Sequence, residues 1–151
     1  AESELTDALI AACNLPYLTR APIIFRDKKY VDGGVATPIP LQQALEMGAE
    51  RIVVVMTRPR GFRKDKSTFL TRMIGGFFDE FSHLKELIED DYISYNRDKS
   101  FVENFVSDQV ELICVEPPQD FPVERLTTRK GLLTQGYAMG LIEGMKLIEK
   151  L

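Results

Sequence analysis

The chain has 151 residues, of which 44% are hydrophobic and 28% are charged. This composition is typical of a soluble globular protein, and the length fits one domain with a buried core. The formal net charge of −4 argues against nucleic acid as a partner, because binding to phosphates needs a basic surface.

The sequence shows no membrane span, no secretory leader and no cysteine pair with metal-binding spacing. No apolar run reaches the roughly 18 residues of a membrane span, and no basic-then-apolar leader opens the chain. Cys13 and Cys114 are far apart and form no metal-spaced pair. We therefore expect a cytoplasmic protein with two reduced cysteines and no cofactor, with a disulfide between the cysteines as the alternative.

The first elements in chain order are a short helix and a hairpin. "AESELTDALIAACNLP" predicts a helix that is capped by Ser3 or Thr6 and ends before Pro16. Residues 22–25 and 29–31 are short β-type runs, and the polar residues between them predict a hairpin turn.

The next elements predict an α/β fold. Pro40 suits the first turn of a helix that ends near Gly48. The run "RIVVVMT" (51–57) has five consecutive apolar residues, which predicts a parallel strand buried on both faces. Residues 110–116 form a second run of the same kind. Strand, helix and strand in this order are the signature of a βαβ unit.

Helical patterns fill the rest of the chain. An apolar stripe predicts a helix that packs on the protein's own core, with a helical lid or a partner-binding face as the alternative. The stripe comprises Leu70, Ile74, Phe77, Phe81, Leu84 and Ile88. A second amphipathic piece carries Phe101, Val102, Phe105 and Val106. From Lys130 to Leu151 a last helix is expected. Gly136, Gly140 and Gly144 share one of its faces, which predicts a close approach to a sheet or a neighbouring helix.

The segment "YVDGG" holds the strongest candidate for chemistry. Asp32 follows a strand-type run, and Gly33 and Gly34 permit backbone angles that are closed to other residues. An ordinary Asp-Gly turn explains this pattern, and so does a carboxylate placed at a strand end where a ligand can reach it. Tyr30 stands where a haloacid dehalogenase has its aspartate nucleophile, and the ligands of an EF-hand, a Walker loop and GxGxxG are absent.

The longer segment around Asp32 resembles the patatin-like phospholipase family. "NLPYLTRAPIIFRDKKYVDGGVATPIPLQQALEMGAERIVVVMTRP" has the family's proline-containing lead-in, strand, DGG, proline, helix, glycine and buried strand in order. The later parts are similar to a bacterial subgroup, through "RPRGFRKDK", the 68–107 region and "ICVEPPQDFPVERL". One departure is Ala12, where the family usually has a serine.

The resemblance implies a fold and half of a catalytic site. The fold is a three-layer α/β/α domain with a mainly parallel sheet and a helical insertion. Residues 1–59 then hold the βαβ core and the aspartate, 60–107 the basic loop and helical region, and 108–151 the last strand and helix. Asp32 matches the aspartate of a serine–aspartate dyad, and Gly33 and Gly34 match its glycines. The serine's GxSxG motif and the oxyanion loop are absent, so we expect the chain to be the C-terminal portion of a longer protein.

The implied function is hydrolysis of a lipid or another acyl ester by the intact parent, with the isolated chain inactive. The alternative is a non-catalytic pseudoenzyme or partner-binding module. A basic loop follows the first buried strand and comprises Arg58, Arg60, Arg63, Lys64 and Lys66. This loop is either solvated or in peripheral contact with anionic lipid. Apolar surface left by a partial sheet predicts self-association or association with the N-terminal part. His83 is expected on the surface, and Cys13 has no neighbouring base in the sequence.

Overall fold

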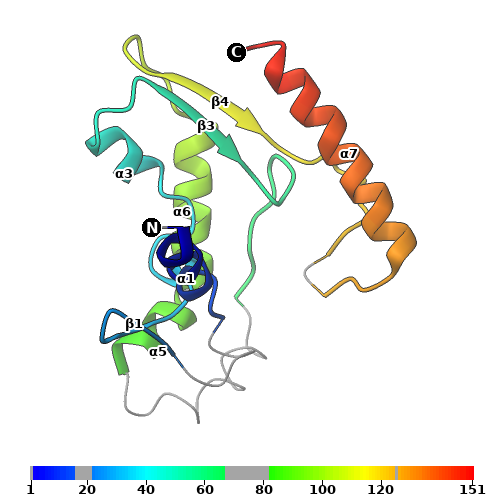
Figure 1. Cartoon of the computed structure of the whole chain (residues 1–151). Helices are drawn as coiled ribbons and strands as arrows, with labels where there is room; N and C mark the ends of the chain where they lie inside the picture. The colour runs from blue at the N-terminus through cyan, green and yellow to red at the C-terminus, as the bar shows by residue number, and fades with distance from the viewer. Residues whose placement is uncertain (1, 16–21, 67–81, 125) are drawn as a thin grey trace. The chain divides into compact units, whose positions relative to one another are not determined.

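The computed structural model describes residues 2–15, 22–66, 82–124 and 126–151 (Figure 1). The chain divides into two compact units. The first comprises Ala1–Pro40 and Arg63–Ser100, and the second comprises Leu41–Phe62 and Phe101–Leu151. Each unit therefore combines two segments that are far apart in the sequence.

The first unit begins with the predicted helix and hairpin, and both elements are confirmed. The predicted cap is wrong, because Ser3 and Thr6 both lie inside the helix. Helix α1 spans Glu2–Ala12, and strands β1 (Ile23–Phe25) and β2 (Lys28–Tyr30) pair antiparallel. The two residues between the strands, Arg26 and Asp27, have φ angles of 47° and 58°. Two consecutive residues with positive φ match the two-residue turns whose twist suits a hairpin.

The first unit also contains helix α5 and most of helix α6. α5 spans Ser82–Glu89 and confirms the C-terminal end of the predicted helical stripe, whereas the stripe's members from Leu70 to Phe81 lie outside the described residues. α6 spans Asp91–Glu103, so it ends before the predicted amphipathic pattern does. Val106 is 90% exposed. In the turn that follows, the Ser107 hydroxyl accepts hydrogen bonds from the backbone N–H groups of Gln109 and Val110, a common alternative to helical hydrogen bonding.

The second unit is built on a parallel strand pair. Helix α3 (Leu41–Glu46) is followed by Gly48 at φ +78°, the left-handed conformation with which helices commonly end. Strands β3 (Arg51–Val55) and β4 (Glu111–Val115) then pair in parallel. The predicted strands and their parallel pairing are confirmed, and the described residues form a mixed fold of helices and strands with a small parallel sheet.

The predicted burial of both faces of β3 is wrong within the described residues. Ile52 is buried, but Val55 is 70% exposed and Val53 is exposed as well. Successive side chains of a strand point to opposite faces. One face of β3 is therefore covered and the other is not, although the apolar run by itself is typical of a strand covered on both sides.

Helix α7 (Lys130–Ile148) confirms the predicted last helix and contacts β4. The three glycines of α7 that were predicted to share a face differ in how closely other residues approach them. A Cβ atom built on Gly136 would lie 2.5 Å from Cγ2 of Val123, whereas one on Gly140 or Gly144 meets no atom of the described residues within 4 Å. The predicted close approach is thus correct for Gly136 and wrong for the other two glycines. No helix in the described part of the chain is long and apolar enough to cross a membrane.

Candidate functional site

Asp32 caps a short helical turn directly after β2. The turn is a 3₁₀ helix, η1 (Gly33–Val35), and Oδ1 of Asp32 accepts a hydrogen bond of 2.7 Å from the backbone N–H of Gly34. A carboxylate in this position satisfies a backbone donor that the helix itself leaves without a partner. The turn interpretation of the sequence is therefore correct in geometry, and it also orients the carboxylate.

Asn14 ties this turn to the end of α1. Its backbone oxygen accepts a 2.8 Å hydrogen bond from the N–H of Asp32, and its Nδ2 donates to the backbone oxygen of Tyr30 at 3.2 Å. Asn14 is only 2% exposed. One buried residue thus holds the chain on both sides of Val31, so the position of Asp32 is set from a separate element.

The second carboxylate oxygen of Asp32 is available. Asp32 is half-buried, and its Oδ2 makes no hydrogen bond or ion pair with any residue that the structure describes. One oxygen is held by the backbone while the other can accept a proton or a hydrogen bond from an incoming hydroxyl group. An oxygen without an intramolecular partner is one requirement of a carboxylate base, which must also lie within hydrogen-bond reach of the proton it accepts.

The two glycines after Asp32 do not adopt backbone angles that are closed to other residues, and Gly34 matters because it has no side chain. Neither Gly33 nor Gly34 has a positive φ, so the prediction that both supply angles closed to other residues is wrong. A Cβ atom on Gly34 would instead lie 2.9 Å from Oδ1 of Asp32, while one on Gly33 meets no atom within 4 Å in the described parts of the chain. Gly34 is required because the carboxylate occupies the space of its side chain.

We expect Gly34→Ala to displace the Asp32 carboxylate and to lower the free energy of unfolding by about 1 kcal/mol, the usual effect of a lost cap. Gly33→Ala is the matched control, because it changes the same residue types without a steric conflict. Hydrogen exchange of the amide at position 34, together with thermal denaturation of both variants, measures the effect. Equal exchange and equal stability of the two variants would contradict this account.

The predicted basic loop divides between the two units. In the second unit, the Arg58 guanidinium lies 5.1 Å from the centre of the Phe62 ring, and Arg60 is exposed. In the first unit, Arg63 donates to Ser100 at 3.3 Å. Contact of this loop with anionic lipid stays a prediction.

Lys64 differs from its basic neighbours because it is committed to intramolecular contacts. Its ammonium pairs with the half-buried Asp91, and its backbone exchanges two hydrogen bonds with the Asn96 side chain, at 2.7 and 2.9 Å. Lys66 is exposed. A cation engaged in this way anchors the loop, so within the first unit the exposed Arg63 and Lys66 are more accessible to a lipid surface.

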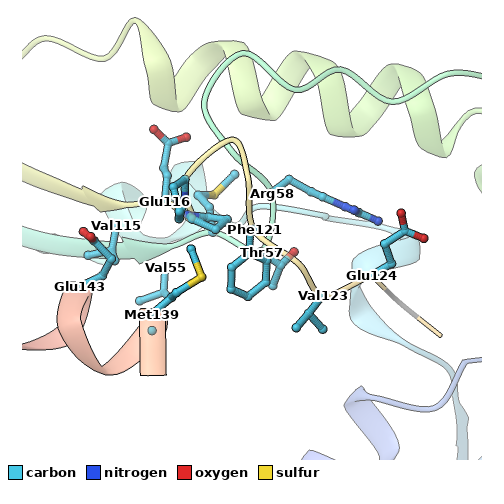
Figure 2. Close-up of a pocket in the computed structure, with 14 residues that line it drawn as sticks. Val55, Thr57, Arg58, Val115, Glu116, Phe121, Val123, Glu124, Met139 and Glu143 are labelled. Carbon is cyan, nitrogen blue, oxygen red and sulfur yellow. The ribbon is translucent and has the colours of Figure 1, made fainter. Parts of the chain in front are cut away.

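A pocket of about 490 Å³ lies at the C-terminal ends of β3 and β4 (Figure 2). It combines both strand ends, the proline-rich segment after β4, and one face of α7. Its lining comprises Val55, Met56, Thr57, Arg58, Val115, Glu116, Pro117, Pro118, Phe121, Val123, Glu124, Met139, Gly140 and Glu143. Parallel sheets commonly bind ligands at this edge, and the volume falls in the usual range for small-molecule sites.

Apart from Arg58, the residues of this pocket were not predicted as a site, although a signal was available. Two parallel strands have their C-terminal ends at the same edge of a sheet. The predicted strands therefore imply that Thr57 and Glu116, which follow those ends, lie near each other. The contribution of α7 through Met139 had no such signal, because it depends on how the helix packs.

The remaining sequence candidates do not form sites. His83 is exposed and lies 3.6 Å from a carboxylate oxygen of Glu86, as expected of a surface residue. Cys13 and Cys114 are exposed and are not joined in a disulfide. Among residues 2–15, 22–66, 82–124 and 126–151, no group of three or more His, Cys, Asp or Glu could hold a metal ion.

Comparison with known proteins identifies relatives without a described activity. Residues 81–151 match a domain family described as a domain of unknown function, DUF6363. The chain is 24% identical over 140 residues to the uncharacterized protein YjjU of Escherichia coli strain K12, an alignment that covers 91% of this chain and 38% of that protein. No solved structure matches significantly. The chain therefore spans less than two fifths of the length of the curated relative that it matches.

Proposed function

We propose that this chain supplies the aspartate of a serine–aspartate hydrolase that acts on lipid or other acyl esters. The observation that carries the proposal is the Asp32 carboxylate, with Oδ1 held by the Gly34 N–H and Oδ2 without a partner among the described residues. The resemblance of residues 14–59 to patatin-like phospholipases supports the same role, because Asp32 occupies the position of the dyad aspartate.

In the proposed mechanism Asp32 acts on a serine outside these 151 residues. Oδ2 accepts the proton of the serine hydroxyl while the serine oxygen attacks the ester carbonyl carbon. The ester C–O bond breaks, the alcohol leaves with the proton, and an acyl-enzyme remains. Water then attacks the acyl carbon, releases the acid, and returns the proton to the serine.

The fixed Oδ1 explains why an aspartate can serve here without a histidine. The backbone N–H of Gly34 donates a hydrogen bond to Oδ1 and thereby orients the carboxylate. The link from Asn14 to both sides of Val31 restricts the backbone that carries the carboxylate. A base held in one orientation needs less reorganisation when the hydroxyl approaches.

The test uses the full-length protein that contains this chain. We expect Asp32→Asn to reduce hydrolysis of a p-nitrophenyl ester by about 10²–10⁴-fold, the usual contribution of a positioned base. Asp27→Asn is the matched control, because Asp27 lies in the exposed hairpin turn at φ 58°, a conformation that asparagine tolerates. Circular dichroism of both variants checks that the fold is retained.

Two results would overturn the proposal. One is full activity of Asp32→Asn in the intact protein. The other is ester hydrolysis by the 151-residue chain itself, which contains no GxSxG motif. If the complete protein also lacks an elbow serine, the Asp32 turn is structural, and the chain is better described as a partner-binding module.

A further inference from the structure

The pocket of the second unit is built without Asp32, which belongs to the first unit. Its wall is largely apolar. Val55 and Val115 end the two paired strands, Phe121 and Val123 follow β4, and Met139 enters from α7 (Figure 2). This wall can take up an alkyl chain or another apolar body of small-molecule size.

One end of this pocket carries two opposite charges, neither of which forms an ion pair within the part of the chain that the structure describes. Arg58 stacks on Phe62 and makes no ion pair with any described residue, and the Glu124 carboxylate has neither a hydrogen bond nor an ion pair there. Figure 2 shows the Arg58 side chain pointing toward the end at which Glu124 lies. Glu143, which Figure 2 draws away from that end, differs because it is paired with Lys146 at 2.7 Å.

Among ligands with the same apolar tail, the Arg58 and Glu124 charges determine which head group fits the pocket. A fatty acid satisfies Arg58 but places its carboxylate near Glu124, and an alkylammonium satisfies Glu124 but faces Arg58. A head group that carries both a phosphate and an ammonium group complements both side chains at once. Guanidinium groups bind phosphate oxygens through directed hydrogen bonds, and carboxylates pair with ammonium groups.

We propose that this pocket binds a zwitterionic amphiphile, with its alkyl chain against the apolar wall and its phosphate and ammonium groups at Arg58 and Glu124. The site stands on its own observations and does not depend on the proposed role of Asp32. A phosphoester with an alkyl tail and an ammonium head is the chemistry of a zwitterionic lysophospholipid.

The charge test uses the 151-residue chain and three detergents with the same dodecyl tail, each below its micelle concentration. Isothermal titration calorimetry compares dodecylphosphocholine, dodecyl phosphate and dodecyltrimethylammonium. We expect dodecylphosphocholine to bind about tenfold more tightly than the other two, because it alone satisfies both charges. Phosphocholine without a tail should bind at least about tenfold more weakly, because the apolar wall is then left empty.

Charge variants assign the two ends of the head group. Arg58→Gln should weaken dodecylphosphocholine and dodecyl phosphate by about tenfold, and Glu124→Gln should weaken dodecylphosphocholine and dodecyltrimethylammonium by a similar factor. Equal affinity for all three detergents in the wild-type chain would overturn the assignment of the head group.

The shape test uses two glycines of α7. Gly140 lines the pocket and Gly144 does not. A Cβ atom built on either glycine meets no atom within 4 Å among the residues that the structure describes. Gly140→Leu should therefore fold normally and reduce dodecylphosphocholine binding at least about tenfold by filling the cavity, while Gly144→Leu should bind as the wild type does.

Three results refute the proposed site. They are no binding of dodecylphosphocholine, unchanged binding by Gly140→Leu, and a concentration-dependent dimer in light scattering that Gly140→Leu abolishes. The last result would assign the pocket to a second copy of the chain. Ester hydrolysis is not measured in these experiments, so their failure leaves the proposed role of Asp32 unaffected.

Discussion

Leu41→Ala is expected to lower the free energy of unfolding by about 2–5 kcal/mol, the range for truncating a buried leucine. Leu41 begins α3, is 2% exposed, and is one of the two largest side chains among the fully buried described residues. Removing its isobutyl group loses the transfer free energy of the deleted carbons and leaves a cavity. Alanine has the higher helix propensity, but the difference is only a few tenths of a kcal/mol and does not offset this loss.

The control is Met47→Ala, six residues further along the chain. Met47 is 86% exposed, so its truncation should change the stability by no more than about 0.5 kcal/mol. Urea denaturation followed by circular dichroism measures both variants. A loss below about 1 kcal/mol for Leu41→Ala would mean that the site collapses around the smaller residue, which contradicts a rigid core at this position.

Gly136→Leu is the second substitution with a large expected effect, at about 3 kcal/mol of lost stability. Gly136 is buried where α7 crosses the segment that follows β4. A Cβ atom at this position would lie 2.5 Å from Cγ2 of Val123 and 3.3 Å from Cζ of Phe121. Valine has few alternative rotamers, so a leucine here must displace the helix or both side chains.

Gly144→Leu tests the same chemical change two helical turns later. The space beside Gly144 is open, so leucine should raise the stability by up to about 1 kcal/mol through its higher helix propensity. The two substitutions should thus have opposite signs in the same denaturation experiment. A stabilising Gly136→Leu would show that α7 does not pack against Phe121 and Val123 in solution.

The candidate site was predicted in part. Asp32 was identified from its place after a β-type run and before two glycines, and the structure confirms that it follows β2. The reason for the second glycine was not predictable. It depends on the Asp32 carboxylate turning back onto the Gly34 N–H, a contact that strand and turn propensities do not contain. The bridge from Asn14 was missed for a similar reason, since it joins residues that are 16 to 18 positions apart.

The local elements of this protein were predictable from its amino-acid sequence. The hairpin, α3 and its end at Gly48, the two parallel strands and α7 follow from turn chemistry and apolar periodicity, which act between near neighbours in the chain. Which faces are covered, and where a pocket forms, depend instead on contacts between distant parts of the chain. Val55 lies beside Val115 because the parallel register brings together residues 60 positions apart, and α7 closes the pocket because it packs at Gly136. Side-chain contacts over such separations depend on packing, which no local pattern encodes.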